Sequence, residues 1–190
     1  MTMLARSRVL ALAAVAGMLL GACSQPSAQQ GRPAASTAPA RPPKATTPAA
    51  PNAIRARFEG FAGGPGFALP DDLGGRPLVL NVWASWCAPC RKEMPAFQSV
   101  AAQAGGRVGF LGVDYLDEAG AARRLAADTG VTYPLASDPK GTEVSKLGIT
   151  ALPTTLFFSA DGVLRGRRFG ELNADRLRAA IRTYLGLALP

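Results

Sequence analysis

Apolar and polar residues follow one another along the chain in a pattern that predicts strands and helices over residues 54–190. The strongest signal is the dense apolar run at residues 78–84, which is typical of a strand buried on both faces. The other predicted elements, bounded by Gly, Pro and polar residues, are edge strands at 58–61 and 67–69, a buried strand at 108–115, helices at 88–103, 118–129 and 142–147, a hairpin of strands at 154–159 and 163–169, and a helix from the cap Asn173 to about residue 185. This order predicts an α/β fold with a mixed central sheet flanked by helices.

The first 22 residues have the pattern of a bacterial export signal. Arg6 and Arg8 precede an apolar run at residues 9–20, which is shorter than the roughly 20 residues that span a bilayer. The run ends in Leu-Gly-Ala-Cys, which resembles the lipobox of bacterial lipoproteins. That resemblance implies a signal peptide at residues 1–22 and lipid attachment at Cys23, with the chain anchored outside the cytoplasm on a bacterial cell membrane. An ordinary signal peptide with a chance cysteine and a retained anchor are the alternatives.

The stretch from Cys23 to residue 53 is predicted to be a disordered tether. It contains no large apolar residue after Cys23, and seven of the residues from 26 to 51 are proline. Such a segment buries too little surface to offset the entropy of ordering it. The folded domain is therefore predicted at residues 54–190.

The formal charge of +8 says little about partners, because the excess lies mostly in the N-terminal segment. Five of the 21 basic residues and none of the 13 acidic residues precede residue 52, which leaves 16 against 13 in the rest of the chain. A nucleic-acid partner is not predicted, since it requires a concentrated basic face. The chain has no histidine, which excludes Cys–His and Ser–His nucleophile pairs and His-ligated metal or haem.

Cys87 and Cys90 form a Cys-x-x-Cys motif, which by itself fits half of a metal site, a structural disulfide or a redox pair. A zinc site takes four ligands, and the remaining cysteine, Cys23, belongs to the export signal, so a metal would have to be shared between chains. A structural disulfide across so short a loop would stabilise the fold little. The redox interpretation fits the position best. Cys87 would begin a helix, whose N-terminus stabilises a thiolate, and Cys90 would be shielded one turn later.

Residues 83–95 (Trp-Ala-Ser-Trp-Cys-Ala-Pro-Cys-Arg-Lys-Glu-Met-Pro) resemble the active-site segment of the TlpA/ResA-like (DsbE-like) branch of the thioredoxin superfamily. Residues 148–155 (Gly-Ile-Thr-Ala-Leu-Pro-Thr-Thr) resemble its second signature. The resemblance implies a thioredoxin fold with an inserted helix region, here residues 112–139, in which turns are predicted at 133–134 and 138–139. It also implies a thiol:disulfide oxidoreductase with a redox-active disulfide and no other cofactor or metal. Its expected partners are protein thiols or disulfides and a membrane redox protein.

The same resemblance assigns roles to individual residues. Pro153 matches the cis-proline of the family, which faces the cysteine pair and helps to dock an extended substrate segment. The residues that the resemblance places in this substrate groove are Trp86, Pro89, Leu152, Pro153 and Thr154. The alternatives are a trans proline that opens a strand and a Trp86 that only packs in the core.

Asn81 marks a departure from thioredoxin itself, which has a buried aspartate six residues before its first active-site cysteine. An asparagine cannot take up a proton. The TlpA/ResA-like branch shares this change and has an acidic residue just after the motif, which Glu93 matches, on the same side of the predicted helix as Cys90. We therefore predict that Glu93 tunes the thiol pKa values and assists proton transfer. The alternative is a surface glutamate in the first turns of a helix.

The predicted function is thiol–disulfide exchange with protein substrates. The family includes oxidants and also reductants, which often serve cytochrome c maturation. We expect a reductant, which needs a membrane electron donor because the extracytoplasmic space is oxidising. A disulfide-forming oxidant is the first alternative. A peroxiredoxin-like peroxidase and a metal-binding lipoprotein are alternatives of other classes, although the residues before Cys87 lack the Pro-x-x-x-Thr-x-x-Cys setting of peroxiredoxins.

Overall fold

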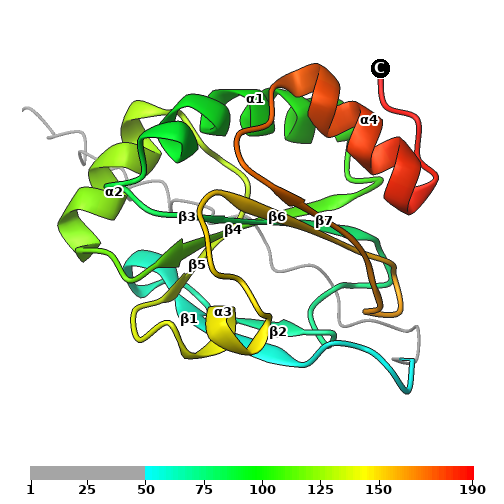
Figure 1. Cartoon of the computed structure of the whole chain (residues 1–190), viewed down its shortest axis with the longest axis horizontal. Coiled ribbons are helices and arrows are strands. Elements are labelled where there is room, and N and C mark those ends of the chain that lie inside the picture. The colour runs from blue at the N-terminus through cyan, green and yellow to red at the C-terminus, as the bar shows by residue number, and fades with distance from the viewer. Residues whose placement is uncertain (1–49) are drawn as a thin grey trace, which may run out of the picture. The chain divides into compact units, whose positions relative to one another are not determined.

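The computed structural model describes residues 50–190 (Figure 1). The predicted signal peptide at residues 1–22, the lipid-attachment residue Cys23 and the tether up to residue 49 lie outside the described residues. The strands are β1 (Ala56–Gly60), β2 (Phe67–Leu69), β3 (Leu78–Trp83), β4 (Gly109–Tyr115), β5 (Leu135–Asp138), β6 (Thr154–Phe158) and β7 (Leu164–Phe169). The helices are α1 (Ala88–Ala104), α2 (Ala119–Asp128), α3 (Thr142–Lys146) and α4 (Ala174–Leu185), with a short 3-10 helix, η1 (Phe61–Gly63).

These strands form one mixed sheet in the order β2-β1-β5-β4-β3-β6-β7. Its inner strands β3, β4 and β5 run parallel, and the β6–β7 hairpin joins antiparallel to β3. At the other edge, β1 pairs antiparallel with β5, and β2 pairs antiparallel with β1. The predicted α/β architecture with a mixed sheet is therefore confirmed. Strand β3, every residue of which is buried, lies inside the sheet as its apolar run predicted.

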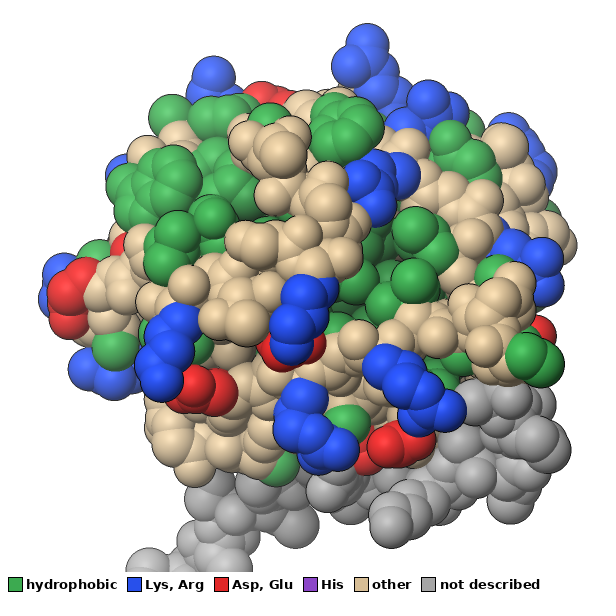
Figure 2. Space-filling model, turned by 60° about the horizontal axis from the view of Figure 1, so that its bottom comes forward, with side chains coloured by type: hydrophobic (Ala, Val, Ile, Leu, Met, Phe, Trp, Pro, Cys, Tyr) green, Lys and Arg blue, Asp and Glu red, His purple; other side chains and the backbone are tan. Residues whose placement is uncertain are grey.

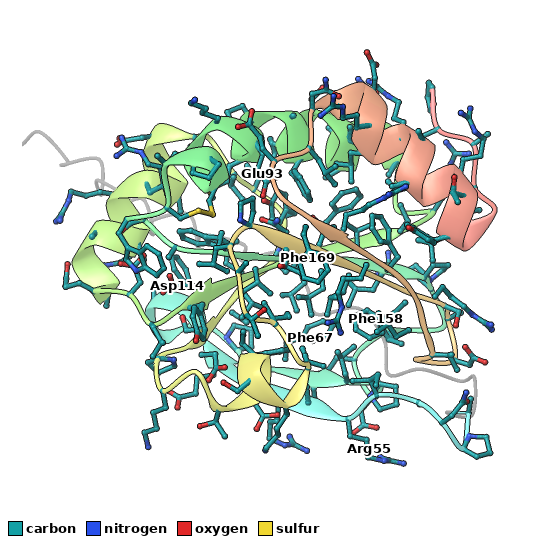
Figure 3. The ribbon with its side chains drawn as sticks, viewed as in Figure 1. Arg55, Phe67, Glu93, Asp114, Phe158 and Phe169 are labelled. Carbon is teal, nitrogen blue, oxygen red and sulfur yellow. A yellow bond between two sulfur atoms is a disulfide. The ribbon has the colours of Figure 1, made fainter. Side chains whose placement is uncertain are left out.

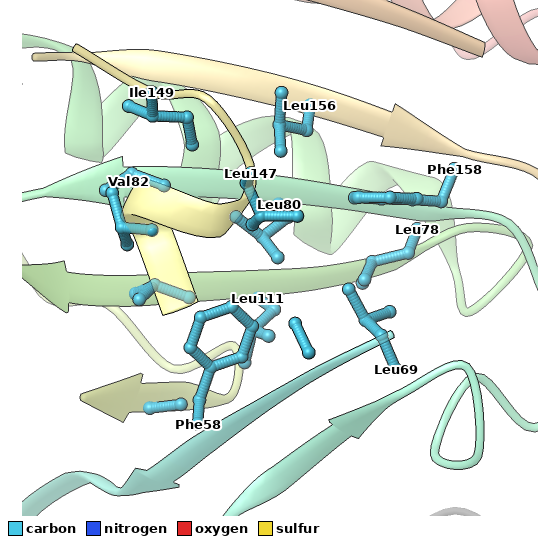
Figure 4. Close-up of a cluster of buried hydrophobic side chains, with 14 of the residues drawn as sticks. Phe58, Leu69, Leu78, Leu80, Val82, Leu111, Leu147, Ile149, Leu156 and Phe158 are labelled. Carbon is cyan, nitrogen blue, oxygen red and sulfur yellow. The ribbon is translucent and has the colours of Figure 1, made fainter. Parts of the chain in front are cut away.

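Helices cover both faces of the sheet. Figure 1 shows α1 and α4 side by side on one face and α3 on the other. Alternation along β3 sends Leu78, Leu80 and Val82 into the cluster on the α3 side, which Figure 4 shows in detail. The intervening residues Asn81 and Trp83 face the α1 side, next to the start of that helix. The α1 side of β3 therefore carries the polar and aromatic groups that surround the cysteine pair.

The helix boundaries follow the sequence signals closely. Asn173 caps α4 as predicted, because its Oδ1 accepts a hydrogen bond from the backbone N–H of Arg176 at 2.9 Å. Helix α1 ends at Gly105, which takes the left-handed conformation at a φ of 56°. Among residues 50–190, no helix is long and apolar enough to cross a membrane.

Two predicted segments differ from the structure. The turns expected at 133–134 and 138–139 flank a strand, β5, which the sequence analysis did not predict. This strand is four residues long and gains its order from pairing with β4 and β1 on either side. The edge strand expected at 58–61 begins earlier and stops at Gly60, since Ala62 and Gly63 take positive φ values of 52° and 80°.

Residues 50–54 run along the turn between β6 and β7. The backbone N–H of Ala50 donates to the carbonyl of Asp161 at 3.1 Å, and that of Ile54 donates to the carbonyl of Gly162 at 3.0 Å. Each bond joins the beginning of the described chain to the distal end of the hairpin. The chain therefore enters the domain at the end of β6 that lies away from Thr154.

Candidate active site

Cys87 and Cys90 lie where β3 passes into α1 and are joined in a disulfide. Cys87 is the N-cap of α1, and its Sγ accepts a hydrogen bond from the backbone N–H of Cys90 at 3.3 Å. The side chain of Cys87 is 5% exposed, whereas Cys90 is completely buried. Both cysteines are thus buried, and Cys90, which was expected to be shielded, is the more deeply buried of the two. Free N–H groups and the dipole at the start of α1 stabilise a thiolate at Cys87.

An open cavity of about 450 Å³ adjoins the disulfide. One wall comes from the start of α1 and another from the segment before β6, and the lining residues are Trp86, Cys87, Ala88, Pro89, Tyr115, Ile149, Thr150, Ala151 and Leu152. The peptide bond between Leu152 and Pro153 is cis, as the resemblance implied. Trp86, Pro89 and Leu152, which the sequence placed in a groove, thus share one cavity with Cys87.

Thr154 does not line this cavity, contrary to the sequence prediction. It is fully buried at the start of β6, and its hydroxyl donates to the carbonyl of Ala151 at 2.6 Å. The reason is that its side chain is covered by surrounding residues and bonds back to the segment that precedes β6. Pro153 is also buried, so the cavity wall is made by the residues before it.

Trp86 is an exposed residue and not a core residue. Its side chain is 61% exposed, and its indole Nε1–H donates to the carbonyl of Leu116 at 3.2 Å. Leu116 is itself 46% exposed and lies in the loop after β4. The indole therefore forms an apolar border of the cavity beside Cys87, held by the segment that follows β4.

Glu93 is buried against β3 and not on the surface of α1. Its side chain is 1% exposed, and Figure 3 shows it on the same helix as the yellow disulfide. Oε1 accepts from Asn81 Nδ2 at 2.8 Å, and Oε2 accepts from the backbone N–H of Leu172 at 2.9 Å. Burial raises the pKa of Glu93 to about 7, and the hydrogen bonds from Leu172 and Asn81 only partly oppose that rise. This carboxyl therefore exchanges a proton near neutral pH.

Asn81 suits both protonation states of Glu93. Its Nδ2 donates to the carboxyl group, while its buried Oδ1 has no hydrogen-bond partner among the described protein groups. A rotated amide would offer Oδ1 to a protonated Glu93, so the same side chain can donate to the carboxylate and accept from the acid. An aspartate at this position would place a second buried acid beside Glu93.

Three polar groups close to the cysteines were not predicted from the sequence. Ser85 donates to the carboxylate of Asp117 through its backbone N–H and also through its hydroxyl, the latter at 2.7 Å. Asp114, at the end of β4 (Figure 3), is 6% exposed. Burial and the neighbouring Asp117 raise its pKa to about 7. An acidic residue inside the apolar run at residues 108–115 was the available sequence signal, because charged groups are seldom buried without a partner.

Charged side chains are dispersed over one face of the domain (Figure 2). On the face that Figure 2 shows, Lys and Arg side chains alternate with acidic and apolar side chains and form no continuous stripe. Within residues 50–190, no group of three or more His, Cys, Asp or Glu side chains is placed to hold a metal ion.

Residues 62–167, more than half of the chain, match the AhpC/TSA family. The chain belongs to this family. It is 34% identical to the thiol:disulfide interchange protein DsbE of Xylella fastidiosa, over 60% of this chain and 62% of that protein. It is 33% identical to DsbE of Pseudomonas fluorescens, over 63% of this chain and 68% of that protein. Within the thioredoxin superfamily the chain therefore groups with the DsbE-like thiol:disulfide interchange proteins, as its two signature segments indicated.

A solved structure supports this placement of the DsbE-like chain. The DsbF homologue from Corynebacterium diphtheriae superposes with a TM-score of 0.61 at 27% identity, over 69% of this chain and 85% of that one. The thioredoxin-like fold predicted from the sequence is thereby confirmed. The chain spans about three fifths of the length of the first curated relatives that it matches, 62% and 60%.

Proposed function

We propose that this DsbE-like chain catalyses thiol–disulfide exchange with protein substrates outside the cytoplasm, and that it acts as a reductant. The observation that carries the proposal is one arrangement of three groups. Cys87 begins α1, the segment before cis-Pro153 forms the facing wall of the cavity, and Glu93 is buried one turn after Cys90. This arrangement supplies a nucleophile, a surface for an extended peptide and a proton acceptor.

The order of the two steps follows from the exposure of the two cysteines, because Cys87 is the more exposed and therefore attacks first. The Cys87 thiolate attacks one sulfur of a substrate disulfide, and the other substrate sulfur leaves as a thiolate that takes up a proton. Cys90 then loses its proton and attacks the Cys87 sulfur, which re-forms the intramolecular disulfide and releases the second substrate thiol. Two electrons pass from the cysteine pair to the substrate in this direction.

Glu93 serves the second step in this proposal. Cys90 is completely buried, so water cannot readily take its proton. A carboxyl with a pKa of about 7 is about half ionised at neutral pH, so its ionised form can accept that proton and return it later. Replacing Glu93 by glutamine is expected to slow release of the mixed disulfide about tenfold or more, while attack by Cys87 changes less.

The proposed location and partners follow from the N-terminal sequence and from the compartment. Lipid attachment at Cys23 and the Pro-rich tether would hold the domain near a membrane surface. A reductant in an oxidising compartment needs a source of two electrons for each turnover, which a membrane redox protein would supply. Protein thiols and disulfides, including those of cytochrome c maturation, are the proposed substrate class.

The midpoint potential of the Cys87–Cys90 pair tests the direction of the proposal. The full chain is equilibrated with mixtures of reduced and oxidised glutathione, and the fraction of disulfide is measured. A potential of about −270 mV, as in thioredoxin, supports a reductant. A potential of about −120 mV, as in DsbA, supports the oxidant alternative.

Peroxide consumption separates the exchange activity from a peroxidase, which the AhpC/TSA match makes the second candidate. The reduced full chain is mixed with hydrogen peroxide under the same conditions as with insulin, a protein that contains disulfides. Exchange with insulin and no rapid loss of peroxide is the expected result. The metal content of the purified chain tests the metal-binding alternative in the same way.

A further inference from the structure

Residues 149–152, which form one wall of the cavity beside the disulfide, connect the end of α3 to the start of β6 (Figure 1). The chain leaves α3 at Gly148, whose φ of 66° lies in the left-handed region that favours glycine. The backbone N–H of Gly148 donates to the carbonyl of Ser145 at 2.9 Å, and that of Ile149 donates to the carbonyl of Val144 at 3.3 Å. This helix end satisfies two carbonyls of α3, while the next carbonyls along the chain need other partners.

Arg167 of β7 supplies hydrogen-bond donors to those next two carbonyls. Its Nη2 donates to the carbonyl of Leu147 at 2.6 Å, and its Nη1 donates to the carbonyl of Gly148 at 2.9 Å. The guanidinium also lies over the ring of Phe169, with 5.8 Å between Cζ and the ring centroid, which is a cation–π contact. Because its donors form a rigid planar fork, a guanidinium fixes the two carbonyls together. The first end of the cavity wall is therefore tied to β7.

The other end of the wall is tied to the same strand. Gly170, which directly follows β7, donates its backbone N–H to the carbonyl of Pro153 at 2.9 Å. Phe169 is the register partner of Thr154, the residue with which β6 begins. The bonds at this end are made by the backbone, whereas those at the first end require the side chain of Arg167.

We propose that Arg167 is a positioning residue for the substrate cavity, because its guanidinium holds residues 149–152 in place beside Cys87. The inference deepens the proposed exchange function and rests on it for the effect on substrates. Arg167 does not line the cavity itself and acts through the wall that it holds. Its loss should leave the chemistry of the two sulfurs intact and weaken the docking of protein substrates.

Hydrogen exchange of the oxidised full chain tests this role without any need for activity. In Arg167→Ala, the backbone amides of residues 148–152 should exchange about tenfold faster, because the bonds at the end of α3 lose their support. The amides of β3 should keep their wild-type rates, which shows that the variant is folded. An unchanged rate at residues 148–152 in Arg167→Ala would overturn the proposal.

Arg168→Ala is the matched control. It removes the same charge from the next residue of β7, whose guanidinium lies over the ring of Tyr184 on the other face of the strand. Residues 148–152 should exchange at the wild-type rate in this variant. Equal acceleration in Arg168→Ala and Arg167→Ala would mean that charge on β7, and not the contact with the two carbonyls, sets the rate, and would refute the inference.

Steady-state reduction of two substrates gives the functional readout. The KM for insulin should rise about tenfold in Arg167→Ala with little change in kcat, because two hydrogen bonds that hold the docking surface are lost. Reduction of hydroxyethyl disulfide, which is too small to lie along the wall, should keep its wild-type rate. A loss of equal size with both substrates would place the effect on the cysteines and contradict the positioning role.

Arg167→Lys supplies a second variant that keeps the charge. Its ammonium can still donate to a carbonyl but lacks the planar fork, so it should recover part of the protection from exchange and part of the KM. A lysine variant no better than Arg167→Ala in both measurements argues against the inference. If the wild-type chain reduces neither substrate, the exchange proposal fails, while hydrogen exchange still decides whether Arg167 holds the wall.

Discussion

Replacing Glu93 by glutamine should make the domain more stable above neutral pH even though it slows the proposed chemistry. Burial, the largest cause, raises the pKa of Glu93 from 4.5 to about 7, so the folded state binds more protons than the unfolded state between these values. The free energy of unfolding must then fall as the pH rises through this window and stay low above it. At about 1.36 kcal/mol per pKa unit, the loss is roughly 3 kcal/mol.

Glutamine removes this loss and keeps the contacts. Its Oε1 can accept the backbone N–H of Leu172, and its Nε2 can donate to the unpartnered Oδ1 of Asn81 after that amide rotates. Above pH 7 the wild-type carboxyl is ionised while buried, which lowers the free energy of unfolding. The neutral glutamine side chain avoids this loss. We expect the variant to equal the wild type near pH 4.5 and to exceed it by up to roughly 3 kcal/mol near pH 8.

Urea unfolding of the oxidised full chain at a series of pH values measures the difference. Glu171→Gln is the matched control, because it removes an exposed carboxylate that acts only weakly on Glu93. The control should follow the wild-type curve closely. If Glu93→Gln lost stability between pH 4.5 and pH 7 in parallel with the wild type, the assignment of the buried proton to Glu93 would be refuted.

Three further substitutions test the fold and the site. Gly112→Ala should destabilise the domain by about 1–3 kcal/mol in urea unfolding, because the new Cβ would lie 2.6 Å from Leu135 and 2.9 Å from the Trp83 indole nitrogen; an unchanged midpoint contradicts this. Asn173→Ala should cost about 1 kcal/mol through loss of the α4 cap, and Asn173→Asp should restore it. Cys90→Ala should accumulate a mixed disulfide with insulin on non-reducing gels, unlike Cys87→Ala.

The sequence predicted the elements whose signals are local. The apolar run of β3, the glycine at the end of α1 and the asparagine cap of α4 each act within a few residues, so the structure keeps them nearly unchanged. Strand β5 has no such signal, since it is short, lies between Pro134 and Pro139 and depends on pairing with β4 and β1. The turns predicted at both ends are compatible with a strand between them, but the strand forms only because β4 and β1 pair with it.

The same distinction applies to the site. Spacing placed Glu93 on the Cys90 side of α1, but its burial requires the chain near Leu172, which is remote in sequence and closes over it. The resemblance assigned Thr154 to the groove, whereas its side chain is buried and its hydroxyl donates to the carbonyl of Ala151. The contact between Ser85 and Asp117 joins two loops and has no local pattern at all.

The hydrogen bonds of Ala50 and Ile54 to the β6–β7 turn fix the beginning of the described chain to that turn. Strand β6 runs from the cis-proline to that turn, a length of about 17 Å at the usual rise per residue. A change in this turn would therefore act first on the end of β6 that lies away from the cis-proline.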